Sequence, residues 1–223
     1  MKSSCRPGGR RPAPDWRLCL VADPEAAAGR DLAFIVLAAV DAGVTIVQLR
    51  AKNLITRHFL ALAKTLAAQL KRRRIPFVIN DRVDIALACG ASGVHLGRDD
   101  MPCAEARKIM GRERLIGLSV TEADEAEQAE ALGADYLGVW PVFPTATKET
   151  GLPPLGIDGL RGIRSRVKIP ILAIGGIKAA NAAQVMAAGA DGVAVVSAIC
   201  SAPDPAQAAA ALLAGLGPRR RRR

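Results

Sequence analysis

A chain of 223 residues, half of them hydrophobic but only 3% aromatic, is long enough for one sizeable core, which must be built from Ala, Val, Ile and Leu. Its formal charge of +10 lies mainly at the ends, because Arg219 to Arg223 carry five positive charges and residues 1–14 carry four. With no aromatic platform and no apolar run of about 18 residues, the chain is predicted to contact nucleic acid only non-specifically, through its tails, and not to cross a membrane.

Three segments are expected along the chain. Residues 1–14 are predicted to be a disordered basic leader, residues 15–217 a catalytic domain, and residues 218–223 an Arg-rich tail. The five cysteines are odd in number, show no CxxC spacing and follow no secretory signal, so we expect reduced thiols and a cytoplasmic location. The sequence leaves homo-oligomer formation open.

A recurring phrase marks the boundary between a helix and a strand. It occurs at residues 42–49 (AGVTIVQL), 90–97 (GASGVHLG), 133–139 (GADYLGV) and 189–196 (GADGVAVV). In each phrase the Gly is expected to end a helix in the left-handed conformation, and the β-branched run that follows is typical of a buried parallel strand.

Further apolar runs alternate with these phrases. They lie at residues 18–22, 76–79, 115–119 and 170–174, which brings the predicted strands to eight. Helical periodicity fills the gaps, most clearly at residues 59–73, 123–133 and 181–189. Eight βα units of about 20 to 30 residues predict an α/β fold, a single closed (β/α)8 TIM barrel of parallel strands with short basic tails.

Polar side chains follow the predicted strands, always at the carboxyl-terminal end. They are Gln48, Arg50, Lys52, Asn80, Asp81, Asp100 and Ser119, with Thr145, Thr147 and Lys148 in the loop after the sixth strand. Because the carboxyl ends of barrel strands meet at one rim, we expect these side chains to converge on a single active site.

Cations and carboxylates are both present at this rim. Arg50, Lys52 and Lys148 would meet above a nearly neutral barrel, where a pyrophosphate is a fitting partner. Asp81 and Asp100 are hard oxygen ligands with no His pair or Cys pair nearby, so they suit Mg²⁺ bridging phosphate oxygens better than zinc. For any one of these residues, an ordinary surface ion pair is the alternative.

A second anion site is indicated after the last two strands. Backbone N–H groups of the Gly175-Gly176 turn and of Val196-Ser197 lie where barrels of this kind commonly bind phosphate, although two glycines also make an ordinary tight turn. Two phosphate sites, one of them assisted by a metal, suggest a reaction that joins two phosphorylated small molecules with loss of pyrophosphate.

Five ordered segments resemble the thiamine-phosphate synthase family. They are residues 48–52, 79–102, 117–120, 133–148 and 170–199. The resemblance covers roughly residues 17–200 and implies a transferase that couples hydroxymethylpyrimidine pyrophosphate with thiazole phosphate. In this dissociative substitution the aminopyrimidine stabilises the methylene cation left by pyrophosphate, and the thiazole nitrogen captures it. Such chemistry needs positioning and electrostatic stabilisation and no protein nucleophile.

The resemblance also implies a role for each site residue. The pyrimidine pyrophosphate would be bound by Gln48, Arg50, Lys52, Asn80, Ser119 and Lys148. The Mg²⁺ ligands would be Asp81 and Asp100. The thiazole phosphate would contact Thr145, Ala146, Thr147, Gly176, Val196 and Ser197.

Some positions depart from the family pattern. Trp140 stands where the family has Gly, and Cys19 and Ala22 replace the usual Tyr and Thr of the first strand. The Trp140 indole is expected to narrow the thiazole site, to alter which thiazole is accepted, or to pack beneath the substrate loop. The two histidines, His58 and His95, are expected to be structural.

Three other interpretations fit parts of the sequence. An open Rossmann or flavodoxin-like sheet commonly has five or six strands, and no GxGxxG follows the first strand here. A thiazole tautomerase would share the barrel but transfer a proton, so it would not need the cations and carboxylates of a pyrophosphate site. A non-catalytic barrel that binds thiamine precursors or nucleic acid is supported only by Trp140 and the Arg-rich tail.

The charge distribution leads to a first testable prediction. Deleting residues 219–223 removes five positive charges from outside the predicted barrel, so turnover should be unchanged while retention on a polyanion column becomes weaker. Steady-state kinetics and salt elution of the two proteins measure these effects. Loss of soluble, active protein on truncation would contradict the prediction.

Overall fold

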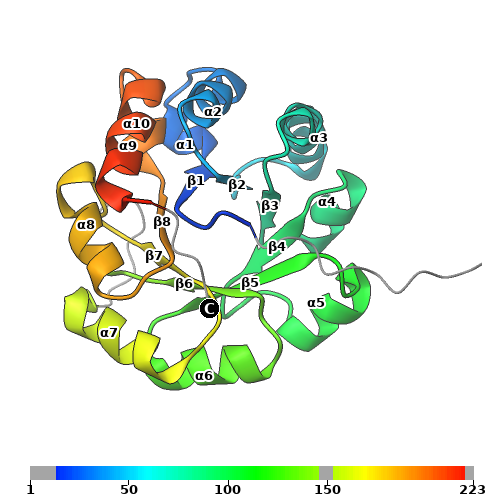
Figure 1. Ribbon diagram of the computed structural model, residues 1–223. Coiled ribbons are helices and arrows are strands. Elements are labelled where there is room, and N and C mark those ends of the chain that lie inside the picture. Colours follow the sequence, from blue (N-terminus) through cyan, green and yellow to red (C-terminus); the bar gives the residue numbers. More distant parts are fainter. Residues whose placement is uncertain (1–13, 146–152, 219–223) are drawn as a thin grey trace, which may run out of the picture.

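Eight parallel strands close into a barrel in the computed structural model, which describes residues 14–145 and 153–218 (Figure 1). The strands are β1 (Leu18–Ala22), β2 (Ile46–Leu49), β3 (Phe77–Asn80), β4 (Gly93–Leu96), β5 (Leu115–Val120), β6 (Tyr136–Val139), β7 (Ile171–Ile174) and β8 (Gly192–Val195). They pair in sequence order, and β1 closes the barrel on β8 with Leu18 opposite Val193. The predicted (β/α)8 barrel is confirmed; its basic tails lie outside the described residues.

Helices surround the strands in an outer ring (Figure 1). They are α1 (Pro24–Ala27), α2 (Leu32–Asp41), α3 (Thr56–Arg72), α4 (Val83–Ala88), α5 (Cys103–Met110), α6 (Ala123–Ala131), α7 (Gly156–Arg166), α8 (Ala179–Ala187), α9 (Ser197–Cys200) and α10 (Pro205–Leu216). In the two described ranges, no helix has both the length and the apolar character needed to span a membrane.

The recurring Gly phrase ends helices as predicted, with one correction to the boundary. The last helical residue lies two positions before the Gly, which follows the cap residue and has a positive φ of 112° at Gly43 and 84° at Gly133. The N–H of the next residue then bonds to the carbonyl five residues back, as in Val44 to Ala39 and Ala134 to Ala129. This hydrogen bond satisfies a helix-end carbonyl and turns the chain directly into the next strand.

Successive side chains along a strand point alternately outward and inward, so the apolar residues form two cores, one outside and one inside the barrel. In β1, Leu18 and Leu20 pack outward against the helices, whereas Cys19 and Val21 belong to a small cluster inside the barrel. That inner cluster includes Trp16 and Tyr136, whose ring centroids are 4.9 Å apart. Trp16 precedes β1, so aromatic packing fills the interior from the amino-terminal side and leaves the opposite rim for a site.

Close backbone approach beside Trp16 leads to a prediction about stability. A Cβ at Gly192 would lie 1.7 Å from the Trp16 carbonyl oxygen, so Gly192→Ala must shift the pairing of β8 and should destabilise the fold by about 2 kcal/mol or more. Gly162→Ala is the control: this α7 position has nothing within 4 Å, and Ala should stabilise the helix by about 0.5–1 kcal/mol. Urea unfolding compares the variants, and equal midpoints would contradict the expectation.

Candidate active site

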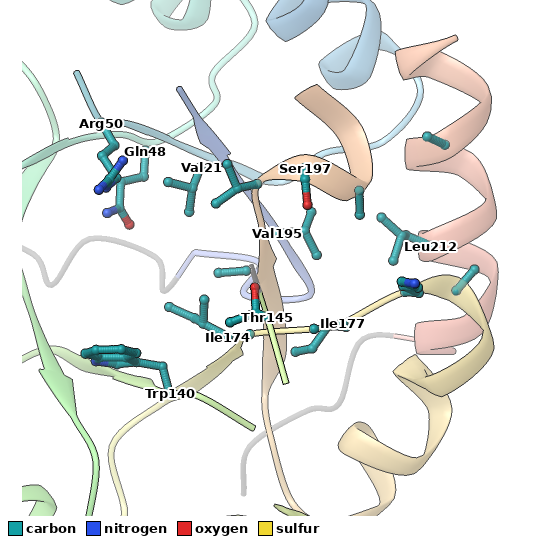
Figure 2. A pocket seen from close by; sticks show the side chains of 18 of the residues that line it. Val21, Gln48, Arg50, Trp140, Thr145, Ile174, Ile177, Val195, Ser197 and Leu212 are labelled. Atoms are coloured by element: carbon teal, nitrogen blue, oxygen red, sulfur yellow. The ribbon is translucent and has the colours of Figure 1, made fainter. Parts of the chain in front are cut away.

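A cavity of about 510 Å³ opens at the carboxyl-terminal rim of the barrel. Every strand, or the residue directly after it, contributes to its wall: Val21, Gln48, Asn80, His95, Ser119, Trp140, Ile174 and Val195. The cavity also brings together other residues predicted from sequence, namely Arg50, Thr145, Gly176, Val196 and Ser197. Figure 2 shows Gln48, Arg50 and Trp140 on one side of the opening and Ser197, Ile177 and Leu212 on the other.

Two buried amides form the floor on the side of β2 and β3. Gln48 and Asn80 are 4% and 9% exposed, and the Gln48 Nε2 donates to the Asn80 Oδ1 at 2.8 Å. This bond fixes the two amides against each other. It leaves the Gln48 carbonyl oxygen as an acceptor and the Asn80 Nδ2 as a donor for a group in the cavity.

Arg50 is held at the mouth by a carboxylate that the sequence analysis did not single out. Asp23, 3% exposed, follows β1 and forms an ion pair with the Arg50 guanidinium. Its other oxygen accepts from the Glu25 N–H at 2.9 Å and so caps α1. The sequence could have identified Asp23, because it is the first polar residue after a predicted strand, as Asn80 is after another.

Lys52, Asp81 and Asp100 form a charged group beside the cavity. The Lys52 Nζ lies 3.4 Å from the Asp81 Oδ2, and the Asp100 Oδ2 accepts from the Gly97 N–H at 2.6 Å. Burial, and then the neighbouring Asp100 carboxyl, raise the pKa of Asp81 to about 6 against the opposing effect of Lys52. Two carboxyl groups that repel each other in this way form a site where a cation would be stabilised.

The backbone at Asp81 is unusual. Its φ is +64°, in the left-handed region that Asp and Asn tolerate better than other residues with a side chain, and its N–H donates to the His95 carbonyl at 2.8 Å. No group of three or more His, Cys, Asp or Glu residues with metal-binding geometry occurs in the described parts of the chain. Asp81 and Asp100 are therefore a pair of carboxylates that would need further ligands from a substrate or water to complete a Mg²⁺ shell.

His95 was expected to be structural, but its ring also reaches the cavity. It is 4% exposed and lies between Tyr136 and Ser119, with 3.0 Å from its Nδ1 to the Tyr136 hydroxyl and 2.9 Å from its Nε2 to the Ser119 hydroxyl. Alternation within β4 places Val94 in the outer core and the imidazole inside the barrel. A polar residue on the inward face of a strand was the signal for this role.

The turn after β7 packs directly on the loop after β6. Gly175 and Gly176 have φ values of 100° and 63°, and a Cβ at Gly176 would lie 2.5 Å from the Pro144 carbonyl oxygen. Within the described residues, the Gly176 N–H donates to no protein group. Beside it, Val196 and Ser197 continue the wall from β8 into α9. Backbone at this end of the cavity can therefore donate to an anion.

Lys178 is a cation at this end that the sequence analysis did not name. It is exposed at the N-cap of α8 and lines the 510 Å³ cavity together with an adjoining cavity of about 490 Å³. The second cavity is also bordered by Asp23, Arg50 and Ser197. The sequence could have identified Lys178 by its position two residues after the Gly175-Gly176 turn.

Trp140 occupies part of the cavity wall at the end of β6 (Figure 2). Its side chain borders the cavity, and its effect on the thiazole site stays a prediction. In the view of Figure 2 it lies on the side of Gln48 and Arg50, away from Ile177. Of the predicted site residues, Ala146, Thr147 and Lys148 lie outside the described residues.

Known proteins match both the sequence and the architecture. Residues 18–199 match the family model described as thiamine monophosphate synthase. The thiamine-phosphate synthase of Albidiferax ferrireducens is 54% identical over 86% of this chain and 88% of its own, and that of Chloroflexus aurantiacus is 50% identical over 90% and 92%.

A solved structure, the thiamine phosphate pyrophosphorylase from Pyrococcus furiosus, superposes with a TM-score of 0.83 at 38% identity and covers 91% of this chain and 96% of its own. The closed parallel barrel, the polar rim and these relatives agree. The chain belongs to the thiamine-phosphate synthase family of transferases.

Proposed function

We propose that this chain couples hydroxymethylpyrimidine pyrophosphate with thiazole phosphate in the 510 Å³ cavity, releasing pyrophosphate. The observation that carries the proposal is the arrangement of this one cavity, in which Gln48 and Arg50 border one side and Ser197 borders the other (Figure 2), with Gly176 also in its wall. Two anionic substrates would then meet with their reacting groups between the two sides.

The pyrimidine ring would lie against Gln48 and Asn80. Their mutual hydrogen bond leaves the Gln48 carbonyl oxygen to accept and the Asn80 Nδ2 to donate, which suits an aminopyrimidine that presents an amino group beside a ring nitrogen. Ser119, from β5, would supply a third polar contact. Because both amides are buried, the ring would be held away from water in one orientation.

The pyrophosphate would lie toward Arg50 and Lys52, with Lys148 as a third cation. Arg50 and Lys52 are each paired with a carboxylate, Asp23 and Asp81 respectively, which holds the two cations at the rim before substrate arrives. Asp81 and Asp100 would hold Mg²⁺ through carboxylate oxygens. Mg²⁺ bound there would neutralise charge on the departing pyrophosphate.

The thiazole phosphate would be bound at the opposite end. The Gly176 N–H and the backbone of Val196 and Ser197 would donate to its phosphate, and Lys178 would add a positive charge. Thr145 lines both cavities and would contact the same substrate, as would Ala146 and Thr147 from the same loop. These residues would direct the thiazole nitrogen toward the pyrimidine methylene carbon.

The protein's contribution would be positioning and electrostatic stabilisation. Departure of pyrophosphate leaves a cation that the aminopyrimidine itself delocalises, and the neutral thiazole nitrogen captures it. Apolar wall residues such as Val21 and Ile174 would keep water from competing as the nucleophile. None of the proposed residues needs to form a covalent intermediate.

Four further statements remain predictions from the sequence. They are the extent of the catalytic domain at residues 15–217, a cytoplasmic location, small phosphorylated molecules as the main partners, and homo-oligomer formation as an open question. Non-specific contact of nucleic acid with the basic ends also remains a prediction.

A direct assay tests the proposed function. The purified chain, mixed with both phosphorylated precursors and Mg²⁺, should form thiamine phosphate and pyrophosphate in equal amounts. Omitting the pyrimidine substrate provides the control for tautomerase activity, since a tautomerase would convert the thiazole phosphate alone. Conversion of the thiazole without pyrophosphate release would overturn the proposal.

The metal assignment predicts the behaviour of Asp81→Asn. Asn tolerates the positive φ at this position, whereas Ala would add backbone strain and confuse the result. The variant should lose about 100-fold in turnover. Measured rates with Mg²⁺ and with excess EDTA provide the comparison, and wild-type activity that is the same in both would show the assignment to be wrong.

The same variant should change the pH dependence of stability in metal-free protein. A folded-state pKa of about 6, above the usual 3.8, means that ionised Asp81 destabilises the fold above pH 6 and that this penalty disappears below about pH 4. Asp81→Asn should therefore have a free energy of unfolding about 1 kcal/mol larger than that of wild type at pH 8. The part of this difference that comes from ionisation of Asp81 should vanish at pH 4. Thermal unfolding of the variant and of wild type at the two pH values measures the difference in stability. A difference that is the same at both pH values would contradict the raised pKa.

Lys178 provides a prediction for the thiazole end. Lys178→Gln removes one positive charge near the proposed phosphate and should raise the KM for thiazole phosphate about 3- to 10-fold, with little change in the KM for the pyrimidine substrate. Lys64→Gln is the control, because Lys64 is exposed on α3 and lines neither cavity. Varying each substrate separately makes the measurement, and a larger effect on the pyrimidine KM would contradict this placement.

A further inference from the structure

Three polar side chains form a continuous line from the barrel interior to the active-site cavity. Tyr136 of β6 is 2% exposed, and its hydroxyl lies 3.0 Å from the His95 Nδ1. The His95 Nε2 lies 2.9 Å from the Ser119 hydroxyl, and Ser119 lines the cavity. The three residues come from the neighbouring strands β6, β4 and β5, so their spacing is set by the barrel itself.

Two glycines make the space in which this line fits. A Cβ at Gly117 would lie 2.1 Å from the Tyr136 Cζ, and a Cβ at Gly138 would lie 2.8 Å from the His95 Cε1. In the barrel register, Gly117 stands opposite Tyr136 and Gly138 opposite Ser119. Any side chain at either glycine would displace a ring, so the tyrosine and histidine rings are confined to these positions.

The hydrogen bonds of the line have one consistent direction. Among the described residues the Tyr136 hydroxyl has one hydrogen-bond partner, the His95 Nδ1. A buried hydroxyl with a single nitrogen partner is best satisfied as the donor, since the reverse arrangement leaves its own proton without an acceptor. The His95 Nδ1 then accepts, so the proton of the neutral ring lies on Nε2 and is donated to the Ser119 oxygen.

We infer that Tyr136 and His95 are positioning residues that fix the Ser119 hydroxyl as a hydrogen-bond donor into the cavity. With its oxygen already accepting from His95, Ser119 directs its own proton toward the substrate. The group it binds is therefore an acceptor, a ring nitrogen or a phosphate oxygen of the pyrimidine pyrophosphate. The identity of this acceptor rests on the proposed placement of the pyrimidine substrate. The direction of the hydrogen bonds among Tyr136, His95 and Ser119 can be measured without any substrate.

Nitrogen NMR tests the direction in the ligand-free protein. The chain has only two histidines, and His58→Gln identifies the resonances of exposed His58, so those of His95 follow. In ¹⁵N-histidine-labelled protein the His95 Nε2 should carry the proton and the Nδ1 should not. In Tyr136→Phe the Nδ1 loses its donor, and this tautomer preference should weaken. A proton on Nδ1 in the wild type, or an unchanged ring in Tyr136→Phe, would overturn the inference whether or not the chain is active.

Kinetics test whether the line acts through Ser119. Tyr136→Phe keeps the ring that packs on Trp16 and should raise the KM for the pyrimidine substrate about 3- to 10-fold, with the KM for thiazole phosphate unchanged. In a Ser119→Ala background the same change should alter the pyrimidine KM less than about 2-fold, because the residue through which it acts is gone. Equal effects in the two backgrounds would show that Tyr136 has only a structural role.

Trp16→Phe provides the matched control for packing. Trp16 contacts the same Tyr136 ring, with centroids 4.9 Å apart, but takes no part in the hydrogen-bonded line. This variant should lower the melting temperature while the His95 tautomer and the ratio of the two KM values stay as in wild type. A shift of the tautomer in Trp16→Phe as large as that in Tyr136→Phe would also overturn the inference.

Discussion

Closure of the barrel is the constraint on which the rest of the structure depends. Once β8 pairs with β1, all eight parallel strands end at a single rim, and residues far apart in sequence become neighbours there. Arg50 meets Asp23 across 27 positions, and Gln48 meets Asn80 across 32. The helices around the strands and the inner aromatic cluster stabilise this closure. A polar rim can therefore vary in chemistry while the apolar layers below keep its geometry.

Much of the fold could be predicted because its signals are local. A Gly with positive φ, followed by an apolar run, marks where four of the helices stop and the next strand begins, as at Gly43 and Gly133. The exact helix ends were predicted one or two residues late, because the Gly belongs to the turn and not to the helix. The position of Gln48 and Asn80 at the cavity was predictable for the same local reason, since amides at the ends of buried strands are unsuited to an apolar core.

What the sequence did not reveal depends on contacts across the rim. Asp23 neutralises a cation that had been assigned wholly to substrate, and this pairing requires β1 and β2 to be adjacent. The place of His95 in the line to Ser119 depends on the register of β4 and β5 together with the space at Gly138. The left-handed backbone of Asp81 has no sequence signal beyond the residue type. Each of these features is determined by a neighbouring strand and not by its own segment.

The last helix has a consequence for how the protein is made. Ala208, Ala211 and Leu212 of α10 form part of the cavity wall, and β8, which closes the barrel, follows the other seven strands in the sequence. A ribosome synthesises the chain from the opposite end, so a nascent polypeptide that stops before β8 has an open sheet and lacks this wall. Folding must wait for contacts that are distant in sequence, which is slow compared with local helix formation. The substrate site is therefore assembled only after β8 and α10 have been synthesised, and translation products that stop before them lack a complete binding cavity.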